Sequence, residues 1–173
     1  YYDITIFFRK VFLRAIIIYV LIFPIISLWL PIKQLFFGFS FSFKSIVFLW
    51  ASGLFNLLIL VNLLLKDYWG RARPGEILEL GGEQSFTPWF SFSNNCATNC
   101  SFVSGDAAIG FAIISLYFIT KKEVYFWLSL IFGCLLGSIR MMEGGHFLSD
   151  VVMAGFIIYI AYFIQTKLFY KHA

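Results

Sequence analysis

Five long apolar runs constrain what this chain can fold into. They cover residues 12–30, 45–65, 105–120, 123–139 and 150–168. A helix of about 20 apolar residues crosses a bilayer, and only a helix or a closed barrel satisfies every backbone polar group in lipid. Barrel strands alternate apolar and polar residues, and these runs do not alternate. The sequence therefore predicts an all-α integral membrane protein.

The composition agrees with this prediction, since 61% of the residues are hydrophobic and 13% are charged. The 173 residues leave room for a bundle of about five to six transmembrane helices and none for a separate soluble domain. We therefore expect a single transmembrane domain over residues 1–173. The formal net charge is +4, but no basic stripe on a soluble fold is present to follow a nucleic-acid backbone. The expected partner is the bilayer, with no nucleic acid.

The lysines indicate which side faces the cytoplasm. With five spans, the connections 66–104 and 140–149 fall on one side of the membrane. The opposite side carries six lysines: Lys33, Lys44, Lys121, Lys122, Lys167 and Lys171. The positive-inside rule therefore predicts that the two connections face away from the cytoplasm. Arg9, Lys10 and Arg14 conflict with this orientation, and we expect residues 1–14 to form an interfacial amphipathic segment that removes the conflict.

Three polar clusters lie at span ends on the outer side. They are KDYWGRARP (residues 66–74), CSFVSGDAA (100–108) and SIRMMEGGHFLSD (138–150). In the last cluster His146 and Asp150 are four residues apart, which predicts that they share one face of a helix. A carboxylate in that position can hold an imidazole in one tautomer and stabilise its cation. A nucleophilic or basic histidine requires both.

Together the three clusters indicate a phosphate site with a nucleophile. Guanidinium and ammonium groups and a Ser-Gly helix N-terminus donate hydrogen bonds to a tetrahedral dianion. Such cations supply the positive charge that divalent ions supply elsewhere, so neither a metal nor another cofactor is expected. Taken singly, each residue also has an ordinary structural explanation. Span-end cations commonly anchor helices at the membrane interface, and Ser104 and Asp106 would cap a helix.

In order and spacing, the polar residues of these clusters resemble the three signature motifs of the type 2 phosphatidic acid phosphatase superfamily: Lys66-x6-Arg73-Pro74, Ser104-Gly105 and Arg140-x5-His146-x3-Asp150. The resemblance covers about residues 45–165. It implies a helical bundle with its active site at the outer membrane face, metal-independent hydrolysis and a covalent phosphohistidine intermediate. For a bacterial member it implies a multi-pass protein of the inner membrane with the site facing the periplasm.

The resemblance also implies a role for each motif residue. His146 would be the nucleophile, and Asp150 would orient it. Three cations, a hydroxyl and a backbone N–H would hold the phosphoryl oxygens: Lys66, Arg73, Arg140, Ser104 and Gly105. Arg71 is a second-tier candidate that either contacts the substrate or faces water beside Asp67.

One position departs from the family's pattern. Where the superfamily usually reads Pro-Ser-Gly-His, this chain reads VSGD over residues 103–106, so an aspartate stands in place of the histidine that protonates the leaving group. Either Asp106 is a carboxylic acid kept protonated by burial and the nearby phosphate, or the proton comes from water or another residue. A helix N-terminus and flanking cations would oppose protonation of Asp106.

The implied substrate is a phosphate monoester of a membrane lipid. The forms GRARP (residues 70–74) and SFVSGD (101–106) look most like the lipid A phosphatase branch. Undecaprenyl pyrophosphate and phosphatidylglycerophosphate phosphatases are the alternatives, and a pyrophosphate would tolerate the missing histidine because a phosphate leaves with little protonation. A non-catalytic lipid-phosphate binder or transporter is disfavoured by the intact motifs. Transport also needs discontinuous helices at mid-membrane, and the sequence indicates none.

Cys96 and Cys100 lie in the outer connection, in the stretch CATNC. An oxidising compartment permits a disulfide between them. Metal binding by the pair is the weaker alternative, because no histidine or carboxylate lies close by in sequence to complete a tetrahedral site.

Overall fold

The computed structural model describes residues 42–170 and, before them, Phe7, Lys10, Val11, Arg14 and Ile18. The span expected at 12–30 and the interfacial segment expected at 1–14 lie outside the described residues, apart from these five positions. Two of the counted lysines, Lys33 and Lys171, also lie outside them.

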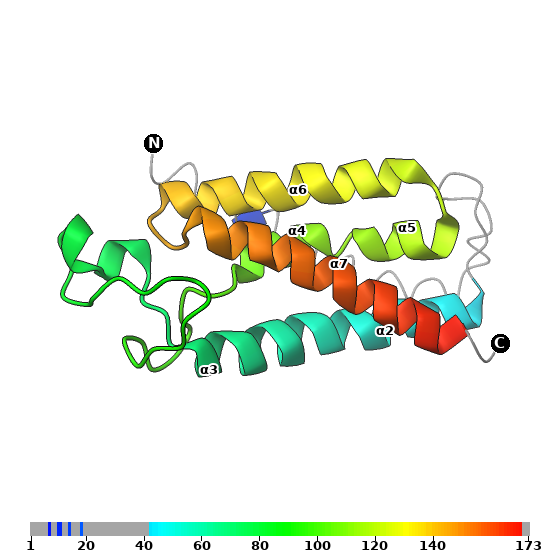
Figure 1. Ribbon diagram of the computed structural model, residues 1–173. Helices are drawn as coiled ribbons and strands as arrows, with labels where there is room; N and C mark the ends of the chain where they lie inside the picture. Colours follow the sequence, from blue (N-terminus) through cyan, green and yellow to red (C-terminus); the bar gives the residue numbers. More distant parts are fainter. Residues whose placement is uncertain (1–6, 8–9, 12–13, 15–17, 19–41, 171–173) are drawn as a thin grey trace.

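The described residues form helices and no strand; an isolated bridge joins Ile77 and Gln84. The elements are α2 (Phe43–Leu54), the π-helix η1 (Phe55–Lys66), α3 (Asp67–Trp69), the 3-10 turns η2 (Pro74–Glu76) and η3 (Leu78–Leu80), α4 (Gly105–Phe111), α5 (Ile114–Thr120), α6 (Glu123–Met142) and α7 (Leu148–Tyr170). The long helices run side by side, and the connection between α3 and α4 gathers at the end where α6 turns into α7 (Figure 1).

Four of the five predicted spans correspond to helices. Three stretches are long and apolar enough to cross a membrane: Phe43–Glu76, Glu123–Met142 and Leu148–Tyr170. The shorter apolar stretch Gly105–Thr120 corresponds to the predicted span at 105–120. The prediction of an all-α membrane fold is confirmed, and the chain is a multi-pass membrane protein.

The helix predicted over 105–120 is present, with a two-residue turn at Ala112 and Ile113. α4 ends at Phe111 and α5 begins at Ile114. Serine hydroxyls satisfy the carbonyls at the turn: Ser129 donates to the Phe111 carbonyl at 2.8 Å, and Ser115 donates to the Ala112 carbonyl at 2.8 Å. Ala112 and Ile113 keep right-handed helical backbone angles, so the direction of the chain is maintained through the turn.

Glycines let α4 lie directly against α6. A Cβ added to Gly110 would come within 2.7 Å of the Gly133 Cα atom, so the two backbones touch. A Cβ on Gly133 would lie 2.3 Å from the Phe111 ring. Small residues allow this close approach between membrane helices, where packing rather than the hydrophobic effect drives association. The contact holds the beginning of α4 near the end of α6, which carries Arg140.

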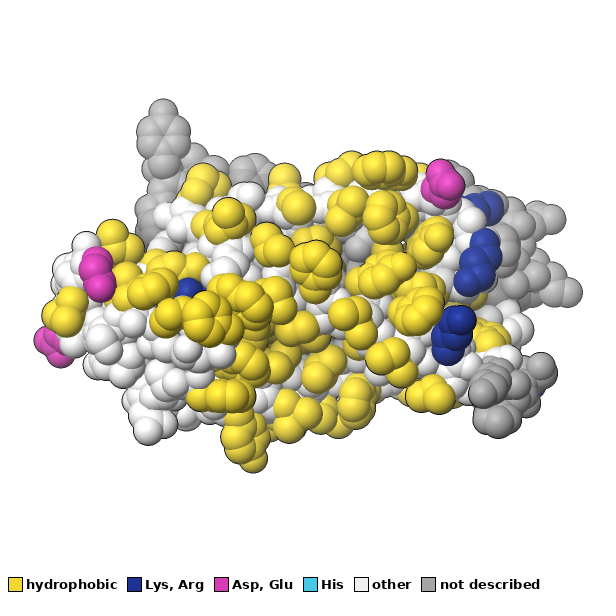
Figure 2. Space-filling view, viewed as in Figure 1, with side chains coloured by type: hydrophobic (Ala, Val, Ile, Leu, Met, Phe, Trp, Pro, Cys, Tyr) yellow, Lys and Arg dark blue, Asp and Glu magenta, His cyan; other side chains and the backbone are white. Residues whose placement is uncertain are grey.

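The side surface of the bundle is apolar, as a lipid-facing surface must be. Figure 2 shows hydrophobic side chains over the length of the helices, with most of the visible Lys and Arg side chains at the end opposite the α3–α4 connection. Inside the bundle, Asn56 of η1 and Gln165 of α7 exchange two side-chain hydrogen bonds of 2.9 and 2.8 Å. Paired polar groups of this kind join helices in a membrane.

Candidate active site

Backbone hydrogen bonds join the three motif segments pairwise. The N–H of Gly75, the residue that follows the first segment, donates to the Gly144 carbonyl of the third at 3.1 Å. The Ser101 N–H donates to the Arg71 carbonyl at 2.8 Å, which links the second to the first. The Ser104 N–H donates to the Asp150 carbonyl at 3.2 Å, which links the second to the third. Segments far apart in sequence therefore meet at one end of the bundle.

His146 is buried at this junction, with 3% of its surface exposed. Its Nδ1 atom lies 2.7 Å from the carbonyl oxygen of Ser101. Because a carbonyl only accepts, we assign the proton to Nδ1, which leaves the lone pair on Nε2. Nδ1 also lies 3.8 Å from Oδ2 of Asp150, too far for a hydrogen bond, so the carboxylate acts on the ring through its charge.

His146 and Asp150 do not share a helix face in the way the sequence predicted. Helix α7 begins at Leu148, so His146 lies in the turn before it. The Asp150 carboxylate turns back and accepts from the Phe147 N–H at 2.9 Å and from the Ser101 hydroxyl at 2.6 Å. The predicted pair does approach, with His146 in the turn ahead of α7 and Asp150 in the first turn of the helix.

Arg71 is the main residue whose place the sequence analysis missed. Its side chain is buried and pairs directly with the Asp150 carboxylate. Its Nε donates to the Thr87 carbonyl at 2.8 Å, and its Nη1 donates to the Ser149 hydroxyl at 2.9 Å. The expectation that Arg71 faces water beside Asp67 was wrong, because the side chain is 2% exposed; contact with the substrate stays a prediction. Its position in the first motif was the only signal, because the sequence does not show which span-end cation turns inward.

The surroundings of His146 favour a neutral imidazole. Burial lowers the pKa of His146 below its ordinary value of 6.5 because the charged form loses solvation. Asp150 opposes this shift, while the positive charges of Lys66 and Arg140 lower the pKa further. A neutral imidazole at pH 7 has the free lone pair that a nucleophile needs.

The cations of the first and third motifs surround the start of α4. A Cβ added to Gly105 would lie 3.3 Å from the Lys66 Nζ atom, so glycine leaves room for the ammonium there. Arg73, Arg140 and Asp106 all interact electrostatically with Lys66. The structure therefore brings the predicted cations together around one position.

Arg140 is held between two carboxylates. Its Nε lies 3.3 Å from Oδ2 of Asp106, and its Nη1 pairs with Glu143. A Cβ added to Gly145 would lie 2.5 Å from Arg140 Nη2, so this glycine lets the guanidinium pass beside the His146 turn. Glu143 is a second residue that the sequence analysis did not assign to the site.

Ser104 caps α4. Its hydroxyl oxygen accepts from the Ala107 N–H at 3.4 Å, and its side chain is fully buried. The cap uses the oxygen as an acceptor and leaves the hydroxyl proton as a donor. The capping explanation for Ser104 is confirmed, and a contact with phosphate through the same hydroxyl stays a prediction.

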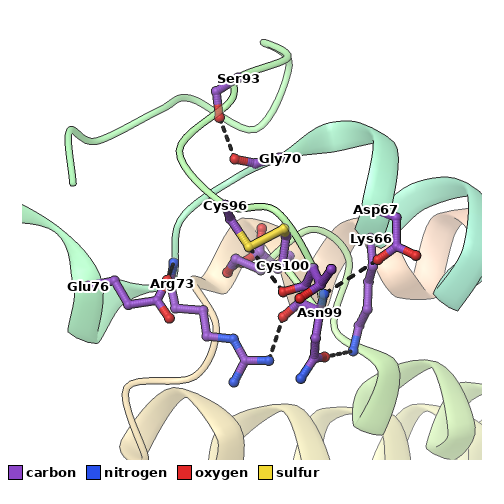
Figure 3. The surroundings of a disulfide bond; sticks show 12 residues. Lys66, Asp67, Gly70, Arg73, Glu76, Ser93, Cys96, Asn99 and Cys100 are labelled. Atoms are coloured by element: carbon purple, nitrogen blue, oxygen red, sulfur yellow. Dashed lines mark hydrogen bonds between the residues drawn. A yellow bond between two sulfur atoms is a disulfide. The ribbon is translucent and has the colours of Figure 1, made fainter.

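Cys96 and Cys100 form a disulfide, so the disulfide prediction is confirmed and metal binding by this pair is wrong. The loop that the disulfide closes carries Asn99, which lies between Lys66 and Arg73 (Figure 3). Among the described residues, no group of three or more His, Cys, Asp or Glu side chains could hold a metal ion.

Three named relatives resemble part of the chain. It is 42% identical over 117 residues to the lipid A 4'-phosphatase of Francisella tularensis subsp. novicida (strain U112), covering 65% of this chain and 53% of that protein. Over 98 residues it is 39% and 38% identical to the lipid A 4'-phosphatases of Rhizobium leguminosarum and Rhizobium etli, covering 55% of this chain and 42% and 38% of theirs. The chain thus spans about half, or less, of these relatives' lengths. No solved structure matches it.

The family comparison covers more of the chain. Residues 46–172 match the PAP2 superfamily, and this range contains all three polar clusters. The superfamily that the motifs indicated is therefore confirmed: the chain belongs to the PAP2 superfamily.

Proposed function

We propose that this chain carries the active site of a bacterial inner-membrane phosphatase. The enzyme hydrolyses a phosphate monoester of lipid A through a phosphohistidine intermediate. The observation that carries the proposal is the placement of His146. The ring is buried, its Nδ1 is held by the Ser101 carbonyl at 2.7 Å, and Lys66 and Arg140 act on it electrostatically. The three relatives named lipid A 4'-phosphatases support lipid A as the substrate.

In the proposed reaction, Nε2 of His146 attacks the phosphorus atom. The bond from phosphorus to the lipid oxygen breaks, and its electron pair stays on that oxygen, which takes up a proton. Asp150 stabilises the positive charge that develops on the ring. Water then attacks the phosphohistidine, which releases inorganic phosphate and restores neutral His146.

The phosphoryl oxygens are held by the motif cations in this proposal. Lys66, Arg73 and Arg140 stabilise the charge that develops in the transition state, and Ser104 and the Gly105 N–H complete the cradle. Their convergence at the start of α4 supports this assignment.

For Asp106 we propose a positioning role. Its Oδ2 atom lies 3.3 Å from the Nε atom of Arg140, close enough to fix the direction of the guanidinium. Its side chain is 18% exposed, so water reaches it. We therefore propose that Asp106 orients Arg140 and that solvent protonates the leaving oxygen.

We propose that the site faces the periplasm. Lys44, Lys121, Lys122 and Lys167 lie at helix ends opposite the site, where Figure 2 shows dark-blue side chains, as the positive-inside rule expects for a cytoplasmic end. The connection on the site side carries four exposed aromatic side chains, which suit the headgroup region of a bilayer: Phe86, Trp89, Phe90 and Phe92.

Phosphate release by the purified protein in detergent micelles tests the proposal. Lipid A, undecaprenyl pyrophosphate and phosphatidylglycerophosphate are offered separately in excess chelator, with His146→Ala as the inactive control. We expect fastest release from lipid A and no effect of the chelator. Phosphate release from undecaprenyl pyrophosphate alone would show that this lipid, and not lipid A, is the substrate. A requirement for magnesium would contradict the role of the cations. Binding without release would support a non-catalytic binder.

A further inference from the structure

We propose that Asn99 is a positioning residue of the phosphate site. The Cys96–Cys100 disulfide holds Asn99 where its two carbonyl groups orient Lys66 and Arg73 before the substrate arrives. This inference rests on the proposed function of those two cations in binding phosphate.

Asn99 contacts both cations of the first motif at once (Figure 3). Its side-chain Oδ1 accepts from Lys66 Nζ at 3.2 Å, and its backbone carbonyl accepts from Arg73 Nη2 at 2.7 Å. Its own N–H donates to Asp67 Oδ1 at 3.4 Å, and Asp67 directly follows Lys66 in the chain. One residue of the α3–α4 connection therefore sets the position of two side chains from the first motif.

The backbone conformation explains how one residue reaches both cations. Asn99 has a φ angle of +52°, in the left-handed region that asparagine tolerates better than most residues. The disulfide limits the conformations open to this short loop. Cys100 is fully buried, and the next residue, Ser101, is the one whose carbonyl meets His146. The loop of residues 96–100, called here the Asn99 loop, is therefore followed directly by the residue that contacts the His146 ring.

A neutral amide is suited to this task. An ammonium has three donor hydrogens and a guanidinium has five, so the contacts with Asn99 use one donor of each cation. The amide does not cancel their charge, whereas a carboxylate in its place would compete with phosphate. Ordering long side chains in advance saves the entropy that binding would otherwise cost, about a two- to tenfold gain in affinity for one side chain.

Binding of inorganic phosphate, measured by calorimetry in micelles, tests the inference without a lipid substrate. Asn99→Gly keeps the left-handed backbone without strain and removes the side chain. We expect it to weaken phosphate binding about two- to tenfold and to raise the KM for lipid with little change in kcat. Asn94→Gly, at an exposed position of the same connection, is the matched control and should leave both unchanged.

Two further measurements separate positioning from general stability. Asn99→Asp should weaken phosphate binding more than Asn99→Gly, because it adds a competing charge. Reduction of the disulfide, or Cys96→Ser, should weaken binding in the wild type at least as much as Asn99→Gly, since it releases both carbonyls, and should have less effect in the Asn99→Gly background.

The outcomes distinguish this inference from the proposed function. Equal phosphate affinity in folded wild type and Asn99→Gly would overturn the positioning role, as would a loss of kcat alone. A wild type that binds phosphate but releases none from any lipid would overturn the proposed function while leaving the role of Asn99 measurable by binding.

Discussion

The two sides of the phosphate site are held in different ways. On the nucleophile side, His146, Asp150, Arg71 and Ser101 are all buried and joined to one another through Asp150 or the Ser101 carbonyl. On the cation side, Lys66, Arg73 and Arg140 are half-buried, and their partners are the Asn99 loop, Asp106 and Glu143. A nucleophile must be held in one attack geometry, whereas cations that bind a substrate must stay accessible to it.

The difference teaches where this fold can tolerate change. Removing one partner of a buried ion pair typically costs about 3–5 kcal/mol, because it leaves an uncompensated charge in the interior. Exposed pairs contribute about 0–1 kcal/mol. Changes on the nucleophile side should therefore lower both stability and kcat, and changes on the cation side should lower kcat/KM with little loss of stability.

The largest effect is expected from His146→Ala. Loss of the nucleophile should lower kcat/KM by about 10⁴-fold or more, with phosphate binding largely kept because the cations remain. His172→Ala, which removes the other histidine of the sequence, is the matched control. Activity of the His146 variant near the wild-type value in the lipid phosphate-release assay would exclude the covalent mechanism.

Asp150→Asn should come next. The amide cannot support the developing imidazolium charge, so kcat should fall by about 10²–10⁴-fold, while the affinity for inorganic phosphate stays within a few-fold of the wild type. Steady-state kinetics and calorimetry measure the two quantities separately. A mild effect on kcat would mean that the Ser101 carbonyl alone is enough to orient the ring.

Arg71→Lys and Arg73→Lys form a matched pair that compares the two sides directly. Arg71→Lys removes the guanidinium that contacts Asp150, Thr87 and Ser149. The unfolding temperature should therefore drop, because each lost charged hydrogen bond is worth about 1.5–3 kcal/mol. Arg73→Lys should leave the unfolding temperature unchanged and lower kcat/KM roughly tenfold. Equal thermal shifts in the two variants would contradict the division into a buried and an accessible side.

The pH dependence of kcat/KM reports on His146. Because burial lowers its pKa, the acid limb should lie below pH 6.5, with a tenfold loss per pH unit beneath it. Asp150 raises this pKa and Lys66 lowers it, so Asp150→Asn should move the limb to lower pH and Lys66→Ala to higher pH. The unfolded chain binds the proton more readily than the folded one, so stability should decline as pH falls below about 6.5. A limb above pH 7 would contradict a buried neutral imidazole.

Asp106→Asn should have the smallest effect. If Asp106 orients Arg140, as its 3.3 Å contact indicates, the asparagine keeps a hydrogen-bond acceptor and the rate on lipid A should fall less than about tenfold. A general acid is worth about 10²–10⁴-fold. A loss of that size on lipid A, with little loss on undecaprenyl pyrophosphate, would show that Asp106 is the proton donor after all.

The sequence by itself determined the parts of this protein that depend on local pattern. Apolar runs of membrane length predicted the helices because lipid leaves the backbone few alternatives. The motif spacings predicted which polar residues meet, and the two cysteines of the CATNC stretch predicted the disulfide. The turn at Ala112 and Ile113 was not predicted; the Phe111 carbonyl beside it accepts from Ser129 of α6, a contact between segments that no local pattern shows.

Only the tertiary structure decided how the polar residues are paired. Lys66, Arg71 and Arg73 are equivalent as span-end cations in the sequence, yet Arg71 turns inward to Asp150 while the other two meet Asn99. His146 finds its closest partner in the Ser101 carbonyl, 45 positions away. The physical reason is that burial and hydrogen-bond partners of a charged side chain depend on which segments pack around it, and no local pattern encodes that choice.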